Sequence, residues 1–377
     1  MKNKVLLVMA SGFPPQKFNG GPATSLNNFV SYLQDYFNIF VITQNFDNGS
    51  SDRLQGIKEY QWNDYGKAKV YYVNYEDNNY RYILKLLEEI KPDVIYQNSF
   101  FNAAQSLASL KYRKNSNTRL VLAPRGEFAK SALQIKKLKK YLYILYIKLN
   151  KLTNQIVFQG TSDQEIADIK RIFSKNDAIK LANFPTKFSG GIITHKKEKG
   201  KIFICFIGRI HRIKNILGAI KTLQYVNDSA YVAFDIYGPI EDKEYWEECS
   251  NIIKMLPPNI NVTYCGYLNK DEIGSTLAKY DAFFSPTCGE NYGHSIVEAM
   301  LNGKIVFISD KTPWTNVNKN CGYSFDKDDY RGFANAISAV ANMDEDEYLK
   351  SSEQIFRFIS DSLNIEETID GYQKIFF

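Results

Sequence analysis

The chain has 377 residues, which predicts about two domains of roughly 150 residues each and leaves ample material for hydrophobic cores. Its apolar fraction of 44% and charged fraction of 23% are those of a soluble globular protein, and no apolar run approaches the ~18 residues of a membrane-spanning helix. The five cysteines are scattered without a CxxC pair, which excludes the usual zinc and disulfide patterns and favours reduced thiols in the cytoplasm.

Charge is divided unevenly along the chain. Residues 1–190 hold 27 Lys+Arg against 15 Asp+Glu, a balance of +12, whereas residues 191–377 hold 20 against 26, a balance of −6. A basic half followed by an acidic half indicates two domains with different surroundings.

The first half alternates short apolar runs with helical patterns. Residues 1–15 superficially resemble a signal peptide, but the apolar run Val5–Ala10 is too short and ends in a Gly/Pro loop, so it is interpreted as a first strand. Strands are predicted at 4–10, 37–43, 69–75, 93–99, 119–125 and 155–161, and helices at 80–90, 103–114 and 163–173. Nearly continuous apolar strands separated by helices predict a parallel sheet covered on both faces.

The alternation stops and then restarts. The stretch 184-FPTKFSGGIITHKKEKGK-201 is rich in Gly and Lys and is interpreted as a linker. Further strands are predicted at 201–209, 231–238, 261–267, 281–287 and 304–310. The sequence therefore predicts an α/β fold with domains at 1–188 and 189–360, followed by an aromatic helix at 361–377 that could dock on either half.

The first candidate site follows the first strand, because ligands of open parallel sheets bind beyond the carboxyl ends of the strands. The loop in 11-SGFPPQKFNGGPATS-25 is about 11 residues long against a usual two to six. Pro22 suits the first position of a helix, which would leave the amides of Gly20 and Gly21 free for an anion. The alternative is an ordinary long loop. A GxGxxG fingerprint is absent, which disfavours a dehydrogenase.

The second candidate site is 208-GRIHRIKN-215, after the first strand of the second half. Arg209 ends that strand and Lys214 opens the next helix, so two cations stand at the carboxyl edge, where they suit a diphosphate. The alternative is a solvated basic loop, since His211 and Arg212 stand there too.

The third candidate site is 288-CGENYGHSIVEAMLNGK-304. A helix is predicted from His294 to Leu301, and Gly289 and Gly293 would let the preceding turn point its amides at a ligand. Glu298 lies among apolar residues and needs hydrogen-bond donors such as ribose hydroxyls, whereas Glu290, in the turn, could reach a sugar. The alternatives are a salt bridge or a helix-dipole role for Glu298 and a plain turn residue at Glu290.

A fourth candidate site is 123-APRGEF-128, where Arg125 and Glu127 flank a glycine at a strand end. A loop ion pair is the alternative interpretation.

These motifs resemble one family. The early GGP loop, the GR…KN segment, the YGP turn at 237–239 and the stretch 289-GENYGHSIVEAM-300 are similar, in order and spacing, to those of the retaining glycosyltransferases of family four. The resemblance covers nearly the whole chain, and the Glu-x7-Glu stretch is its most specific part. It implies the GT-B fold, in which two Rossmann-like parallel-sheet domains face a central cleft, with a nucleotide-sugar donor on the second domain and an acceptor on the first.

The resemblance also implies roles for residues. Arg209 and Lys214 would bind the donor diphosphate, Glu298 the ribose and Glu290 the transferred sugar, which makes Glu290, Arg209 and Lys214 the catalytic candidates. The implied donor residues are Gly20, Gly21, Gly208, Arg209, Lys214, Tyr267, Leu268, Glu290, Asn291, Tyr292, Gly293, His294 and Glu298. On the acceptor side stand Arg125 and Glu127. Many members carry a His where this chain has Arg125, which leaves the role of Arg125 open.

The expected reaction needs no cofactor and no metal. Breaking the sugar–phosphate bond builds positive charge on the sugar and negative charge on the leaving diphosphate, which two cations and a helix N-terminus can stabilise. Asp326 and Asp328 could suggest a metal site, but they precede a helical run and are interpreted as helix caps. A sugar-nucleotide epimerase or hydrolase of the same fold and a non-catalytic nucleotide-sugar-binding partner are the alternatives. A UDP-sugar is expected, and a nucleic acid partner is not.

The last notable segment is 130-KSALQIKKLKKYLYILYIKLNKLTN-154. Leu138, Leu142, Leu145, Leu149 and Leu152 form one helical stripe, surrounded by lysines and tyrosines. One interpretation is an outer helix of the first domain with its leucines on the sheet and its lysines in water. The other is that this helix also rests on the cytoplasmic leaflet of a membrane, which fits the polyprenyl-diphosphate-linked saccharide of surface-polysaccharide synthesis that the resemblance suggests as acceptor.

Overall fold

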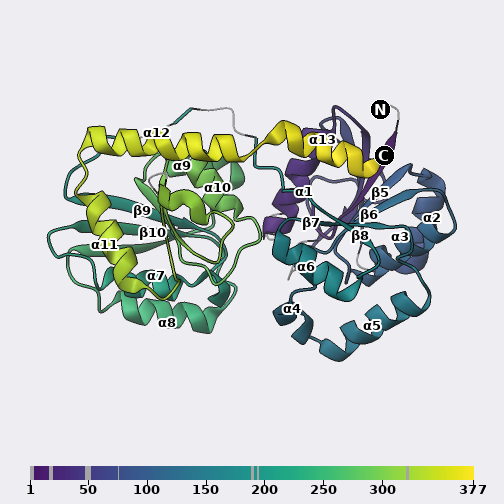
Figure 1. The fold of residues 1–377 in the computed structure, drawn as a ribbon, viewed down its shortest axis with the longest axis horizontal. Helices are drawn as coiled ribbons and strands as arrows, with labels where there is room; N and C mark the ends of the chain where they lie inside the picture. The colour runs from purple at the N-terminus through teal and green to yellow at the C-terminus, as the bar shows by residue number, and fades with distance from the viewer. Residues whose placement is uncertain are drawn as a thin grey trace. The chain divides into compact units, whose positions relative to one another are not determined.

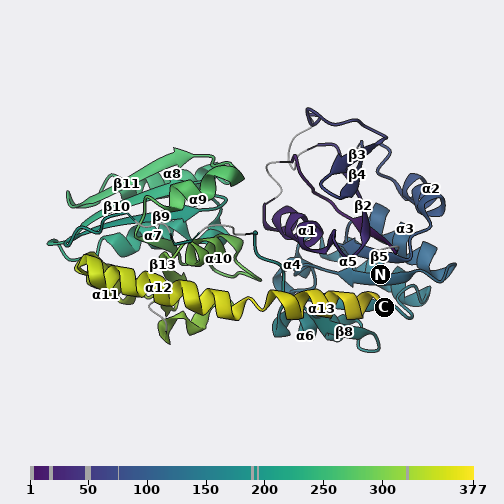
Figure 2. The ribbon, with the colours of Figure 1, turned by 90° about the horizontal axis from the view of Figure 1, so that it is seen from above.

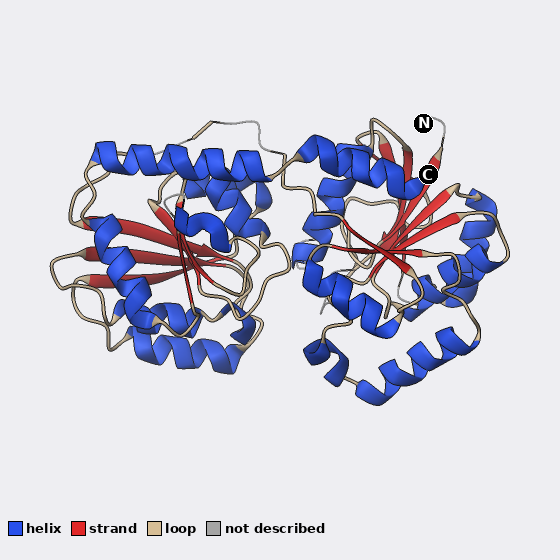
Figure 3. Ribbon diagram, viewed as in Figure 1, coloured by secondary structure: helices blue, strands red, loops and turns tan. Residues whose placement is uncertain are grey.

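The chain folds into two compact α/β units (Figure 1). The computed structural model describes residues 4–16, 20–46, 52–74, 76–187, 191–192, 195–319 and 322–377. Unit 1 comprises Met1–Phe184 and Ile365–Phe377, and unit 2 comprises Pro185–Asn364. The division at Phe184 and Pro185 lies at the start of the predicted linker. In each unit a sheet lies between layers of helices (Figure 3).

Unit 1 is built on an eight-stranded sheet of order β3-β4-β2-β1-β5-β6-β7-β8, parallel except at β3. Its strands are β1 (Val5–Met9), β2 (Asn38–Gln44), β3 (Trp62–Tyr65), β4 (Ala68–Val73), β5 (Val94–Asn98), β6 (Arg119–Ala123), β7 (Val157–Gly160) and β8 (Asp177–Lys180). The six strands predicted in this half are confirmed. The sheet also has two edge strands, β3 and β8, that were not predicted, because each has only four residues and lacks a buried apolar run.

Helices cover both faces of this sheet. They are α1 (Gly20–Leu33), α2 (Tyr80–Ile90), α3 (Ala103–Lys114), α4 (Lys130–Gln134), α5 (Lys137–Leu149), α6 (Asp163–Ile172) and α13 (Ile365–Phe376). On one face, α1 and α13 pack on the sheet, and on the other α2, α3, α5 and α6 do. The predicted helix at 361–377 thus docks on unit 1, through buried Tyr372, Ile375 and Phe376. Pro22 is not the first helical residue, because α1 already begins at Gly20.

Unit 2 has a six-stranded parallel sheet of order β11-β10-β9-β12-β13-β14. Its strands are β9 (Lys201–Ile207), β10 (Tyr231–Tyr237), β11 (Ile260–Gly266), β12 (Ala282–Ser285), β13 (Ile305–Ser309) and β14 (Tyr323–Phe325). Its helices are η1 (Arg212–Lys214), α7 (Ile216–Leu223), α8 (Lys243–Ile253), η2 (Lys270–Glu272), α9 (Ile273–Leu277), α10 (His294–Leu301), η3 (Thr315–Lys319), α11 (Tyr330–Ala341) and α12 (Glu345–Ser362). The five predicted strands are confirmed, and β14 was too short to predict.

The strand order of unit 2 reverses next to β9. The chain runs from β9 outward through β10 to β11, then returns to β12 on the other side of β9 and continues to β13 and β14. The loops after β9 and β12 therefore leave the sheet side by side and diverge to opposite faces, which is the topological switch point where ligands of such sheets bind.

The segment 130–154 is not the single sheet-covering helix that its pattern predicted. It divides into α4 and α5, with Lys136 in the left-handed region between them (φ 53°). Of the leucine stripe only Leu152 is buried, whereas Leu138, Leu142, Leu145 and Leu149 are exposed, so the prediction that these leucines pack on the sheet is wrong. Figure 1 shows α5 along the periphery of unit 1, and Figure 2 shows the same unit from above. Among the described residues, no helix is both long and apolar enough to cross a membrane.

Candidate active site

The turns after β9 and β10 pack backbone against backbone. Gly208 donates its amide to the carbonyl of Tyr237 (2.9 Å), and Gly238 donates to that of Gly266 (2.8 Å). Gly238 has a φ of +138°, and a Cβ added there would lie 1.9 Å from the Gly208 oxygen. The YGP turn therefore requires its glycine, because it sets the path of the loop that carries Arg209.

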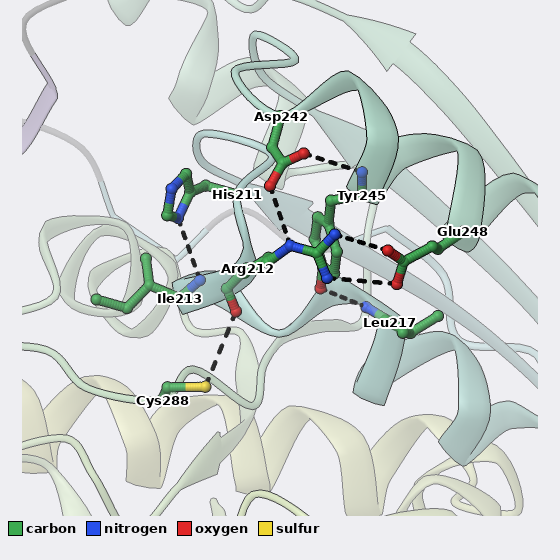
Figure 4. A network of polar contacts seen from close by, with 8 residues as sticks. All are labelled: His211, Arg212, Ile213, Leu217, Asp242, Tyr245, Glu248 and Cys288. Carbon is green, nitrogen blue, oxygen red and sulfur yellow. Dashed lines mark hydrogen bonds and ion pairs between the residues drawn. The ribbon is translucent and has the colours of Figure 1, made fainter.

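The loop after β9 is held by Arg212 (Figure 4). Its guanidinium donates to Glu248 from Nη2 (2.6 Å) and to Asp242 from Nε (3.2 Å), and it lies over the ring of Tyr245. Asp242 also caps α8, and the Tyr245 hydroxyl accepts the Leu217 amide (2.9 Å). Arg212 thus ties the short helix η1, which ends at Lys214, to the start of α8.

The loop after β12 is tied to the same short helix. The carbonyl of Ile213 accepts the amide of Cys288 (2.7 Å) and the hydroxyl of Thr287 (2.9 Å). The Ser309 hydroxyl, at the end of β13, donates to the Thr287 carbonyl (2.6 Å). The backbone amide of Glu290 donates to the backbone carbonyl of Lys311 (3.0 Å). Loops that follow β9, β12 and β13 are therefore locked into one rigid edge at the switch point.

This edge places Lys214 and Glu290 in contact. Their side chains form an ion pair and are only 19% and 17% exposed. The predicted phosphate-binding cation and the predicted sugar-binding carboxylate therefore meet at the switch point, 76 residues apart in the chain. Arg209 is more exposed and pairs instead with Glu241 (2.8 Å).

The turn between the two glutamates enters α10 at Gly293, which has a φ of +75°. The predicted helix from His294 to Leu301 is confirmed. Tyr292 is buried against Trp314, and its ring lies tilted against that of His294 (4.7 Å between ring centroids), so both side chains shape the helix start. Asn291 is exposed.

Glu298 is half-buried on α10. Its carboxylate accepts a hydrogen bond from the Thr186 hydroxyl (2.6 Å). Burial raises the pKa of Glu298, and the hydrogen bond and the positive charge of Lys270 oppose that rise. Lys270 follows the loop of Tyr267 and Leu268, so the predicted base-lining loop comes close to the predicted ribose-binding carboxylate.

The remaining predicted residues lie in unit 1. Gly20 and Gly21 form the first turn of α1, and a Cβ on Gly21 would meet nothing within 4 Å. Arg125 and Glu127 do not pair with each other. The guanidinium of Arg125, whose backbone φ is +55°, donates to Tyr96 (2.7 Å) and Asn183 (2.5 Å).

Glu127 fastens the loop after β6 to the entry of α3. Its carboxylate accepts from the hydroxyl of Ser99 (2.6 Å) and the amides of Phe100 (2.6 Å) and Phe101 (3.1 Å). Burial raises the pKa of Glu127, and these hydrogen bonds counteract it. Within unit 1 both predicted acceptor-side residues therefore hold the ends of β5 and β6 in place.

Three residues beside the site were not predicted from the sequence: Thr186, Glu241 and Lys270. Thr186 lies in the segment interpreted as a linker, and no local pattern connects it to Glu298. Glu241 stands two residues after the YGP turn, which is a signal that could have indicated a partner for Arg209.

Asp326 and Asp328 are not the predicted helix caps. Asp329 caps α11 by accepting the Gly332 amide (2.9 Å), while Asp326 accepts the amide of Asp328 (3.0 Å). Asp328 pairs with Lys327. Over the described part of the chain, no group of three His, Cys, Asp or Glu side chains is arranged to hold a metal ion.

A known protein family matches part of the chain. Residues 193–355 match the family Glycosyl transferases group 1. No curated protein sequence matches the chain.

Several solved structures share the fold of the whole chain. Sucrose-phosphate synthase from Thermosynechococcus elongatus is 13% identical with a TM-score of 0.73, over 99% of this chain and 98% of that one. S. aureus TarM, in a complex with Fondaparinux, alpha-GlcNAc-glycerol and UDP, is 13% identical with a TM-score of 0.69 over 100% of both chains. Anabaena HepE in complex with UDP and glucose is 13% identical with a TM-score of 0.66 over 98% of both chains. Residues 193–355 therefore match the family Glycosyl transferases group 1, and the two units have the GT-B fold of these solved structures.

Proposed function

We propose that this protein is a glycosyltransferase that moves a hexose from a UDP-sugar to a glycan or a polyprenyl-diphosphate-linked saccharide in surface-polysaccharide synthesis, with retention of anomeric configuration. UDP is the nucleotide named in the similar TarM and HepE complexes. The proposed site of action is the cytoplasm or the cytoplasmic face of the membrane.

The observation that supports the proposal most is the contact between Lys214 and Glu290 at the switch point. A cation for the leaving phosphate and an acceptor of sugar hydroxyl hydrogen bonds stand side by side on loops locked by backbone hydrogen bonds. Before the donor binds, each neutralises the other. When the donor diphosphate and its sugar arrive, Lys214 turns to the phosphate oxygens and Glu290 accepts hydrogen bonds from the sugar.

The proposed chemistry breaks the bond between the anomeric carbon and the diphosphate oxygen. The electron pair stays on the diphosphate, where Lys214, Arg209 and the amides of the turn 291–293 stabilise it. The acceptor hydroxyl oxygen bonds to the anomeric carbon on the same face, and its proton passes to the departing phosphate. Fixed cations supply the charge stabilisation, so the proposed reaction needs no metal.

The nucleoside is assigned to Glu298 and the loop of Tyr267 and Leu268. Glu298 accepts a hydroxyl hydrogen bond from Thr186 in this structure. Ribose hydroxyls are the same kind of donor, and the half-buried carboxylate gains from them. The acceptor is assigned to unit 1 at the loop that carries Arg125 and Glu127, whose side chains hold that loop rather than reach outward. The assignment of Gly20 and Gly21 to the donor phosphates stays a prediction.

Binding of UDP-sugars to glutamate variants tests the assignment. Glu298→Ala should weaken donor binding, measured by calorimetry, by roughly 1.5–3 kcal/mol, as expected for lost hydrogen bonds to a charged group. Glu290→Ala should lower turnover more than affinity for UDP. The matched control is Glu353→Ala, which removes an exposed glutamate from the interior of α12. Unchanged donor affinity in the Glu298 variant would show that the ribose assignment is wrong.

Turnover measurements separate the proposal from its alternatives. We expect the activity to survive excess EDTA. We also expect the product to keep the anomeric configuration of the donor. Loss in EDTA with recovery in manganese would favour a metal at Asp326 and Asp328. Donor consumption without an acceptor would indicate the epimerase or hydrolase, and binding without turnover on any acceptor would indicate a non-catalytic partner.

A further inference from the structure

The segment between Phe128 and Ser162 has an extreme composition. It contains seven lysines and neither Asp nor Glu. The lysines are Lys130, Lys136, Lys137, Lys139, Lys140, Lys148 and Lys151. Helices α4 and α5 lie in this segment, and α4 begins three residues after Glu127. A strongly cationic surface thus follows directly on the loop assigned to the acceptor.

One face of α5 is fixed to unit 1. Ile147 is fully buried, and Tyr143 and Ile144 pack against the same core cluster. The Tyr143 hydroxyl shares a hydrogen bond with Ser106 of α3 (2.6 Å). These contacts determine which face of α5 points outward.

The outward face carries the leucines. Leu138, Leu142, Leu145 and Leu149 recur at intervals of three and four residues, so they lie along one side of the helix. Their exposed fractions are 72%, 54%, 39% and 73%. Ile135, Tyr141 and Tyr146 are exposed beside them. Apolar residues on ordinary protein surfaces are scattered singly, whereas these four leucines form one continuous stripe. We therefore expect a binding partner to cover this face.

Lysines flank this leucine face on both sides. Helical spacing puts Lys137 and Lys148 along one flank and Lys139 along the other. Among the described residues, none of these three forms an ion pair with an acidic side chain. An apolar stripe with tyrosines at its margin and lysines on both flanks is the pattern of a helix lying in a membrane interface.

We propose that α5 docks on an anionic lipid surface, with its leucines inserted among the acyl chains and its lysines at the headgroups. A second copy of this chain fits poorly, because two such faces would bring their lysines together. A nucleic acid would contact the lysines but leave the leucines exposed to water. The proposal deepens the proposed function on its acceptor side, since docking would hold the acceptor loop near lipid-linked saccharides, but its test needs no turnover.

Vesicle co-sedimentation of the full chain tests the docking. Binding is expected to vesicles of phosphatidylglycerol and phosphatidylcholine, to be weaker on phosphatidylcholine alone, and to fall at high salt. Each lysine near the surface contributes about fivefold to partitioning. A triple variant should therefore partition onto the anionic vesicles about a hundredfold less or lower still; it carries Lys137→Glu, Lys139→Glu and Lys148→Glu. A second variant keeps the charge unchanged and replaces the four leucines by glutamine. Its partitioning onto the anionic vesicles should be roughly tenfold lower or more; the substitutions are Leu138→Gln, Leu142→Gln, Leu145→Gln and Leu149→Gln.

A matched control places the same types of substitution on unit 2. Lys254→Glu, Met255→Gln, Leu349→Gln and Lys350→Glu alter two exposed lysines and two exposed apolar residues there, and should leave vesicle binding unchanged. Circular dichroism and UDP binding confirm that each variant is folded. No binding to anionic vesicles at low salt, or equal loss in the control, would overturn the proposal. So would a dimer, seen by ultracentrifugation, that only the leucine variant dissociates.

Discussion

At the scale of single residues, the site is defined by charges that are mostly buried and paired. Lys214 and Glu290 satisfy each other in a place where either alone would be poorly solvated. Thr186 does the same for Glu298 with a hydroxyl. Atoms of the proposed donor could replace each of these partners one for one. Without a ligand, the candidate site therefore stays polar and these charges stay paired or hydrogen-bonded.

The Lys214–Glu290 pair predicts strong coupling between two variants. Lys214→Met and Glu290→Gln should each destabilise unit 2, because each leaves a partly buried charge unpaired. The double variant should be more stable than the sum of the single losses predicts, with a coupling of about 1–3 kcal/mol. Urea unfolding of the four donor-free proteins measures this, and additive losses would show that the pair contributes nothing.

Lys304, at the start of β13, makes stability depend on pH. It is fully buried, and burial lowers the pKa of its ammonium from the ordinary 10.5 to about 8. Between these pH values the unfolded chain binds more protons than the folded one, so stability from Lys304 rises as the pH increases through that window. Relative to Lys304→Met, the wild type should therefore gain up to about 3 kcal/mol in unfolding free energy from pH 7.5 to pH 10. If the difference in unfolding free energy between the wild type and Lys304→Met stayed constant from pH 7.5 to pH 10, the lowered pKa of Lys304 would be wrong.

At the scale of elements, the loops of unit 2 are held by close backbone contacts rather than by side chains alone. Gly238→Ala would push a Cβ onto the Gly208 carbonyl and strain a backbone with positive φ, so we expect a loss of at least about 3 kcal/mol in unit 2 stability. Gly289→Ala is the control, since a Cβ there meets nothing within 4 Å and should change stability by less than about 1 kcal/mol. Denaturant unfolding compares the two, and equal losses would refute the packing argument.

Local signals predicted helices well where one face is apolar and an end is capped. Helix α2 begins and ends where predicted, because Asn79 caps its start and its apolar residues lie on one face. Helix α5 defeats the same reasoning because both of its faces are apolar, one with Ile147 and the other with the leucines. A periodic pattern identifies a stripe but not which of two stripes meets the sheet.

At the scale of the whole molecule, unit 1 is assembled from both ends of the chain. Helix α13 follows all of unit 2 in sequence, and its Phe376 packs against Phe29, Phe37 and Tyr96 of unit 1. The C-terminus is therefore part of the first hydrophobic core rather than an appended tail.

This topology predicts that a change at the last residues destabilises the first domain. Phe376→Ala should lower the stability of unit 1 by about 3–5 kcal/mol and leave unit 2 unchanged. Phe377→Ala is the neighbouring control: Phe377 is exposed, stacks on Phe37 and lies under the Lys4 ammonium, so a loss of about 1 kcal/mol is expected. Calorimetry resolves the two units, and a loss confined to unit 2 would contradict the assignment of α13.

The sequence by itself determined the α/β class, the eleven longer strands and the order of the motifs, because apolar periodicity and glycine-rich turns act over neighbouring residues. It also placed Lys214 and Glu290 at strand ends. Only the tertiary structure decided that these two meet, that Thr186 and Lys270 approach Glu298, that α13 returns to unit 1 and that the leucines of α5 face outward. Each of these depends on contacts between residues far apart in the chain, which the strand order and packing of the folded units create and no local pattern encodes.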